Sequence, residues 1–163
     1  MTTQSPDSQT NTAPAARNDR GYSTSYTVEK TPDEVFAAIL NVSGWWTGEI
    51  DGRTDELGAE FSYRYPPQHY SRQRVVEFSP GRRLVWRVID SELSFVSEPA
   101  EWTGSEITFD VVPVAGGTEI RFTHVGLMPD VECYGQCSAA WLHLINGSLR
   151  SLITTGAALP EPW

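Results

Sequence analysis

The sequence predicts a single α+β domain in which a curled antiparallel sheet of six to seven strands wraps around one long C-terminal helix. Residues 130–156 form the longest stretch with helical periodicity, whereas residues 21–124 mostly alternate apolar and polar side chains in short runs. A helix of this length spans about 40 Å and carries a broad apolar stripe, so it needs one large apolar surface to cover. Only the sheet offers such a surface, which places the helix in its concavity.

Length and charge limit the class of protein. The chain has 163 residues, which fits one domain, and a formal net charge of −9. This acidic balance argues against nucleic acid or an anionic membrane as the main partner, because both need clustered Lys and Arg. No apolar run approaches the roughly 20 residues of a membrane span, and residues 1–20 lack the apolar core of a signal peptide. We therefore expect a cytoplasmic protein with no nucleic acid and no membrane as partners.

The chain divides into a polar tail and one domain. Residues 1–20 are rich in Ser, Thr, Asn, Gln and Pro and have no periodicity, which is typical of a disordered segment. The domain is predicted to cover residues 21–158. It opens with a strand at residues 22–28, where polar and apolar side chains alternate.

Two short helices are predicted after this strand. Thr31 and Glu34 form a capping box, and Pro32 takes the first helical position, where its missing N–H has no partner to lose. Trp45 and Trp46 lie in a second short turn or helix bounded by glycines. The strand meander begins after this helical pair.

The meander has one aromatic-rich face. Residues 51–58 predict a loop or short edge strand, and the alternating pattern fails between residues 90 and 104. Every second side chain of a strand points to the same face of the sheet. Counted in this way, the inward positions are Phe61, Tyr63, Tyr65, Arg74, Trp86, Phe109, Phe122 and His124.

The ends and the apolar stripe of the C-terminal helix are also predicted. Asp130 offers a capping carboxylate at the start, and Gly156 offers a stop. The stripe that faces the sheet includes Trp141, Leu144 and Ile145.

Four motifs occur in a characteristic order. They are Thr-Pro-Asp-Glu-Val-Phe at 31–36, Leu-Gly-Ala-Glu-Phe at 57–61, Phe-Ser-Pro-Gly-Arg-Arg-Leu-Val-Trp at 78–86 and Gly-Thr-Glu-Ile-Arg-Phe-Thr-His-Val-Gly-Leu at 117–127. In this order they resemble the START-like SRPBCC superfamily, and more narrowly its activator of Hsp90 ATPase branch with polyketide-cyclase-like relatives. Ser79 departs from the acidic residue usual there. The resemblance covers about residues 20–158 and implies the helix-grip fold, which hosts binding proteins, enzymes and co-chaperones alike.

The aromatic residues of the sheet and the helix predict an apolar pocket between them. Tryptophan and tyrosine combine large apolar rings with one polar group, which is typical of small-molecule sites. By its inward position, Arg74 could pair with a buried acid or an anionic group of the ligand. The predicted ligand-binding residues are Trp45, Trp46, Phe61, Tyr63, Tyr65, Arg74, Trp86, Phe109, Phe122, His124, Trp141, Leu144 and Ile145.

Reactive side chains give little support for catalysis. His124 could act as a ligand contact or general base, but the more frequent role of such a residue is a buried histidine bonded to a neighbouring strand or helix hydroxyl. Cys133 and Cys137 share a helical face that His143 does not share, which argues against a metal site. We predict no catalytic residue, no metal and no cofactor.

The leading hypothesis is therefore a binding protein for a small apolar or aromatic molecule. One alternative, implied by the resemblance, is a co-chaperone-like domain that interacts with Hsp90. Another is a cyclase or hydrolase that uses His124 with a tyrosine in the same cavity. A homodimer and a contact with a chaperone partner are kept as further hypotheses.

Overall fold

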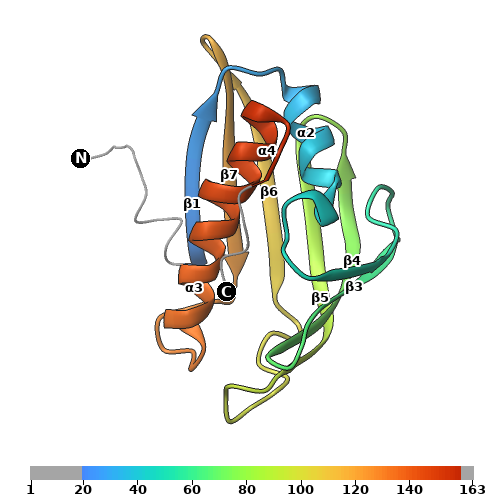
Figure 1. Cartoon of the computed structure of the whole chain (residues 1–163), viewed down its shortest axis with the longest axis vertical. Coiled ribbons are helices and arrows are strands. Elements are labelled where there is room, and N and C mark those ends of the chain that lie inside the picture. The colour runs from blue at the N-terminus through green and yellow to red at the C-terminus, as the bar shows by residue number, and fades with distance from the viewer. Residues whose placement is uncertain (1–19, 159–163) are drawn as a thin grey trace, which may run out of the picture.

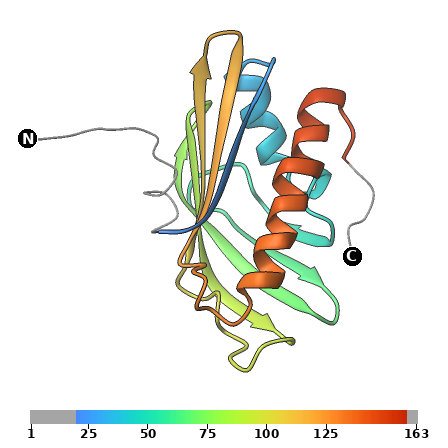
Figure 2. The same cartoon turned by 90° about the vertical axis from the view of Figure 1, so that its left-hand side faces the viewer.

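The computed structural model describes residues 20–158 and confirms the predicted α+β, helix-grip architecture. Seven antiparallel strands form one curled sheet in the order β1-β7-β6-β5-β4-β3-β2 (Figure 1). Figure 2 shows the sheet from the side, with the helices on one face of it. The strands are Gly21–Val28 (β1), Glu49–Gly52 (β2), Glu60–Tyr65 (β3), His69–Ser79 (β4), Arg83–Leu93 (β5), Glu106–Val114 (β6) and Gly117–Val125 (β7).

The first helix begins where the sequence predicts. α2 (Pro32–Leu40) follows Thr31, whose hydroxyl accepts the Glu34 backbone N–H at 3.1 Å. The Glu34 carboxylate accepts the Thr31 N–H at 3.0 Å in return, so the capping box is complete. The short 3₁₀ helix η2 (Val42–Gly44) comes next.

The C-terminal helical segment starts later than predicted. It consists of α3 (Tyr134–Trp141), η3 (Leu142–Leu149) and α4 (Arg150–Thr155), so the prediction that Asp130 caps its first turn is wrong. The carboxylate of Glu101, from the loop between β5 and β6, instead accepts the backbone N–H groups of Glu132 at 3.1 Å and Cys133 at 3.2 Å. A side chain distant in sequence thus satisfies donors at the start of the helix.

The predicted long C-terminal helix is confirmed, and its middle, η3, is π-helical. Two hydroxyl groups bind there: Tyr26 donates to the Ile145 carbonyl at 2.8 Å, and Ser148 donates to the Trp45 carbonyl at 2.9 Å. The end of the segment is as predicted, because Gly156 adopts the left-handed conformation with φ of 86°.

Part of strand β4 faces the opposite way from the prediction. It shifts register against β5 immediately before Gln73 and again after Val75. Val75 is buried, and Phe78 packs edge-on against Phe36 at 5.6 Å, although an odd spacing of three would put them on opposite faces of a regular strand. Arg74 is exposed, so its predicted inward position is wrong.

Aromatic rings fill much of the core between the two layers. Trp45, Trp46 and Trp86 lie nearly parallel, with centroids 6.0–6.4 Å apart. Phe61 and Phe109 each meet Trp86 edge-on at 5.0 Å, which is a favoured geometry for aromatic pairs.

The limits of the domain stay a prediction. The predicted tail, residues 1–20, lies outside the described residues apart from Arg20. Across residues 20–158, no helix has the length and apolar character needed to cross a bilayer.

Candidate functional site

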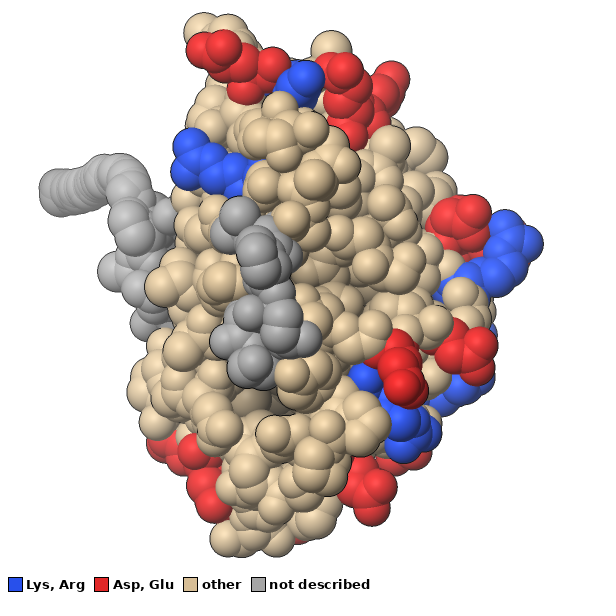
Figure 3. All heavy atoms as spheres, viewed as in Figure 1, with Lys and Arg blue, Asp and Glu red and all other residues tan. Residues whose placement is uncertain are grey.

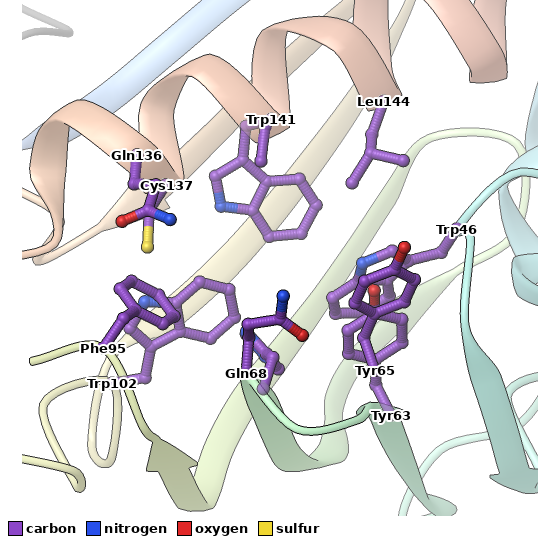
Figure 4. A pocket seen from close by; sticks show the side chains of 12 residues that line it. Trp46, Tyr63, Tyr65, Gln68, Phe95, Trp102, Gln136, Cys137, Trp141 and Leu144 are labelled. Carbon is purple, nitrogen blue, oxygen red and sulfur yellow. The ribbon is translucent and has the colours of Figure 1, made fainter. Parts of the chain in front are cut away.

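An aromatic pocket of about 90 Å³ lies between the concave face of the sheet and the N-terminal part of the C-terminal helical segment (Figure 4). Its walls come from the loop after η2, from β3 and the turn that follows it, from the first residue of β4, from the loop between β5 and β6, and from α3 and η3. The lining residues are Trp46, Tyr63, Tyr65, Gln68, His69, Phe95, Trp102, Gln136, Cys137, Ala140, Trp141 and Leu144.

Stacked rings form two of the walls. Trp46 lies on Tyr63 with centroids 4.1 Å apart and an angle of 14° between the planes. Trp102 lies parallel to Trp141 at 5.9 Å and 13°. Figure 4 shows Trp46 and Tyr63 on one side of the pocket and Trp102 on the other, and Trp46 and Trp141 meet at 5.2 Å.

A glycine lets Tyr63 reach its place in the wall. The Tyr63 hydroxyl donates to the Thr47 carbonyl, which brings the ring against the backbone of Gly48. A Cβ atom at Gly48 would overlap the Tyr63 ring, and φ of +145° at this residue is itself unfavourable for other amino acids.

His124 does not line the pocket but holds two of its walls in place. The indole N–H of Trp141 donates to His124 Nδ1 at 3.0 Å, so the ring proton must lie on Nε2, which donates to Ser105 Oγ at 2.8 Å. Ser105 Oγ in turn donates to the Trp102 carbonyl at 2.6 Å. This chain of bonds, from Trp141 through His124 and Ser105 to Trp102, is called the His124 network below.

Both histidines near the pocket are neutral. Burial, with a smaller contribution from His69, lowers the pKa of His124 to about 3. Burial also lowers the pKa of His69 to about 3, since its ring packs edge-on against Trp102 at 4.5 Å and Tyr63 at 5.0 Å. The more frequent role that we expected for His124, a buried and hydrogen-bonded histidine, is what the geometry shows.

The two cysteines are buried free thiols, and Cys137 lines the pocket. A hydrogen bond with Cys133 and burial raise the pKa of the Cys137 thiol, which makes it a poor nucleophile. Among residues 20–158, no three His, Cys, Asp or Glu side chains gather closely enough to hold a metal ion.

The described pocket has no charged lining residue. Its mouth is polar instead, because Gln68 and Gln136 are both exposed. Figure 3 shows Lys, Arg, Asp and Glu mostly around the rim of the face that carries the helices, with uncharged residues over most of its middle. A charged ligand would therefore lose its hydration inside the pocket without meeting an opposite charge.

Part of the predicted site coincides with this pocket. Trp46, Tyr63, Tyr65, Trp141 and Leu144 line it. Arg74 is exposed on the other face of β4 and cannot pair with a ligand there. The remaining predicted residues are buried but belong to the core around the pocket rather than to its lining: Trp45, Phe61, Trp86, Phe109, Phe122, His124 and Ile145.

Several lining residues were not among the predicted ligand-binding set. Phe95 and Trp102 belong to the segment where alternation fails, so periodicity could not assign them a face. The sequence nevertheless contains a signal for Trp102, because a large aromatic residue in a polar loop often packs back onto the domain. The other unpredicted lining residues are Gln68, His69, Gln136, Cys137 and Ala140.

Comparison with known proteins places the fold in a family. The family model described as Activator of Hsp90 ATPase homolog 1-like protein matches residues 29–153. None of the curated proteins compared with the chain matches it.

Solved structures share the fold at low sequence identity. The Aha1 dimer from Colwellia psychrerythraea is 21% identical with a TM-score of 0.67, over 82% of this chain and 96% of that one. A protein from Mesorhizobium loti is 18% identical with a TM-score of 0.66, over 84% and 98% of the two chains. CalU16 from Micromonospora echinospora is 15% identical with a TM-score of 0.58, over 82% and 76%.

Proposed function

We infer a function from the premise that this chain belongs to the Activator of Hsp90 ATPase homolog 1-like family. We propose that it binds an uncharged apolar or aromatic small molecule in the pocket between the sheet and the C-terminal helical segment. The observation that carries this proposal is the lining itself, in which aromatic rings face each other and no charged side chain takes part. Mostly apolar walls with a few polar groups at one side are the usual features of a small-molecule site.

Binding is favoured over catalysis by the state of the reactive groups. A histidine with a pKa of about 3 is a weak base near neutral pH, and this applies to His69 and to His124. His124 is in addition already bonded at both ring nitrogens. The raised pKa of Cys137 keeps its sulfur in the unreactive thiol form.

The volume of the pocket limits what it can hold. At about 90 Å³ it is smaller than the roughly 150 Å³ cavity that takes up benzene, and much smaller than a typical ligand pocket of about 300–1,000 Å³. A ligand with a full aromatic ring must therefore extend through the mouth beside Gln68 and Gln136, or the pocket must enlarge when the ligand binds.

Titration with N-phenyl-1-naphthylamine, a neutral apolar fluorescent dye, tests the proposal. We expect saturable binding of one dye per chain, with quenching of tryptophan emission, because Trp46, Trp102 and Trp141 line the pocket. Failure to saturate, or uptake only under partly denaturing conditions, would show that the interior is filled by its own aromatic residues.

Two neighbouring alanines of α3 provide a matched pair of variants. Ala140 lines the pocket, whereas Ala139 is exposed. Ala140→Phe should fill the space and weaken dye binding at least about tenfold, which corresponds to about 1.4 kcal/mol. Ala139→Phe should leave the affinity unchanged. The same affinity in both variants would place the dye elsewhere.

A second candidate function is protein interaction. The relative from Colwellia psychrerythraea is described as a dimer, and the family description names an activator of the Hsp90 ATPase. We propose on this basis that the chain forms a homodimer and contacts a chaperone partner, which would place it in the cytoplasm.

Two measurements separate this candidate from ligand binding. Light scattering after size exclusion gives the oligomeric state, and the ATPase rate of purified Hsp90 with the chain added reports on a chaperone contact. Stimulation that Ala140→Phe does not alter would favour interaction through a surface other than the pocket. A monomer with no effect on the ATPase rate would exclude this candidate.

A further inference from the structure

We propose that the pocket continues behind Trp46 into a polar subsite at Gln73 and Trp86, which takes the uncharged hydrogen-bonding group of the ligand. The chemical class that fits is a small aromatic ring carrying a carboxamide, lactam or imide, in which a donor and an acceptor lie side by side. This inference rests on the proposed binding function and specifies which ligands that function would select.

The first observation is the unpaired amide of Gln73. Its side chain is fully buried at 0% exposure, on an inward position of β4 between Phe61 on β3 and Val88 on β5. Neither Oε1 nor Nε2 of Gln73 has a hydrogen-bond partner among residues 20–158. A buried amide that forms no hydrogen bond is costly, so proteins rarely keep one without a use for it.

The second observation is a neighbouring unpaired donor. Trp86 is also 0% exposed, and its indole Nε1 has no hydrogen-bond partner within the described part of the chain. Val88 lies opposite Gln73 and Trp86 lies opposite Val75, so Gln73 and Trp86 are diagonal neighbours on the same face of the sheet. Such positions are about 7–8 Å apart, close enough for both side chains to bind one small polar group.

Trp46 connects the pocket to Trp86. Its ring lines the pocket and stacks on Tyr63, which also lines it, and it lies parallel to Trp86, which does not line the pocket, at 6.0 Å and 3°. Trp45 is fixed by hydrogen bonds from its Nε1 to the Ile39 carbonyl and to its own carbonyl from Ser148. The Trp46 ring, by contrast, is held by packing against the rings of Tyr63, Trp86 and Trp141.

A ligand reaches this subsite when the Trp46 ring is displaced. The same displacement would remove the mismatch between the volume of the pocket and that of an aromatic ligand. The pocket of about 90 Å³ is too small for an aromatic ring, whereas the space occupied by an indole, added to it, brings the total nearer to that of a usual ligand site. The group that reaches Gln73 must be uncharged, because the surrounding residues Phe61, Val75 and Val88 are apolar. A primary amide such as that of Gln73 pairs best with another amide, since each supplies a donor and an acceptor.

Benzamide and toluene are probes of similar size that differ in the polar group. With the full chain labelled with ¹⁵N, titration of each probe followed by the backbone and indole N–H signals gives affinities and locates the contact. We expect benzamide to bind about tenfold more tightly than toluene and to shift the indole N–H signal of Trp86, which toluene should leave in place.

Variants of two glutamines assign the preference to a residue. Gln73→Leu and Gln73→Met remove the unpaired amide and should abolish the preference for benzamide while toluene binding stays unchanged. Gln68→Leu, at the exposed mouth, should retain the preference. Two variants at position 73 guard against a folding defect in one of them, and the dispersion of the N–H signals reports on folding directly.

The outcomes separate this subsite from the proposed function. If both probes bind the native chain with the same affinity, or if the Gln73 variants keep the preference, the subsite is refuted, while ligand binding stands. If neither probe binds and N-phenyl-1-naphthylamine is not taken up either, the proposed function itself fails.

Discussion

Lowering the pH from 7.5 to 5 should destabilise the fold through His124, and the loss follows from its surroundings. The buried ring has a pKa of about 3 in the folded state, against 6.5 for an unperturbed histidine. Between these values the unfolded state binds one proton more than the folded state, so stability falls as the pH drops below 6.5. At pH 5 the loss from this residue is about 2 kcal/mol, a large part of a typical stability of about 5–15 kcal/mol.

His124→Gln isolates this contribution from that of His69, whose pKa is also about 3 and whose effect has the same sign. Glutamine does not titrate, and its amide can accept from the Trp141 indole and donate to Ser105, as the neutral histidine does. Urea unfolding of the native chain and the variant at both pH values measures the difference. The variant should lose about 2 kcal/mol less than the native chain over this range.

The same experiment can refute the reasoning. If both proteins lose the same free energy of unfolding between pH 7.5 and 5, His124 takes up its proton in the folded state as readily as in the unfolded state. Burial would then not be what keeps the ring neutral.

Three further predictions concern packing and can be checked by urea or thermal unfolding. Trp141→Ala should cost about 3–5 kcal/mol, because the ring is buried against Trp46, Trp102 and Phe122; a loss below about 1 kcal/mol would mean that the ring is not packed. Gly48→Ala should destabilise by about 1–3 kcal/mol through overlap with Tyr63, whereas Gly135→Ala, in α3 with open space around it, should stabilise by about 0.5–1 kcal/mol; the reverse order would contradict the described backbone. Arg74→Ala should change stability by less than about 0.5 kcal/mol, since the side chain is exposed. A large loss would show that Arg74 faces inward.

The elements that depend on local chemistry could be predicted from the sequence. The capping box at Thr31 and Glu34 forms as its residue types require, and Gly156 ends the last helix. On the regular strands, alternation correctly turns Tyr63 and Trp86 toward the core. It fails on β4 because Val76 is an extra residue in the ladder between Val75 and Glu77, so the facing changes there, and nothing in the residue types marks where the ladder slips.

The pocket was harder to predict because distant contacts assemble it. Glu101 ties the loop between β5 and β6 to the start of α3 through bonds that span 31 and 32 positions of the chain. The His124 network then fixes Trp102 relative to Trp141. Periodicity describes one element at a time, so it placed Trp141 on the helix but could not bring a loop residue such as Trp102 against it.

We propose above all that a ligand binds between the Trp46 and Trp102 walls of the pocket. The most direct test is to follow the indole N–H signals of the ¹⁵N-labelled chain while N-phenyl-1-naphthylamine is added. Binding between these walls predicts that the signals of Trp46 and Trp102, which line the pocket, shift together and saturate at one dye per chain. The signal of Trp45, which is bonded to the Ile39 carbonyl in the core, should stay in place. Saturable binding that leaves the Trp46 and Trp102 signals unmoved would contradict it.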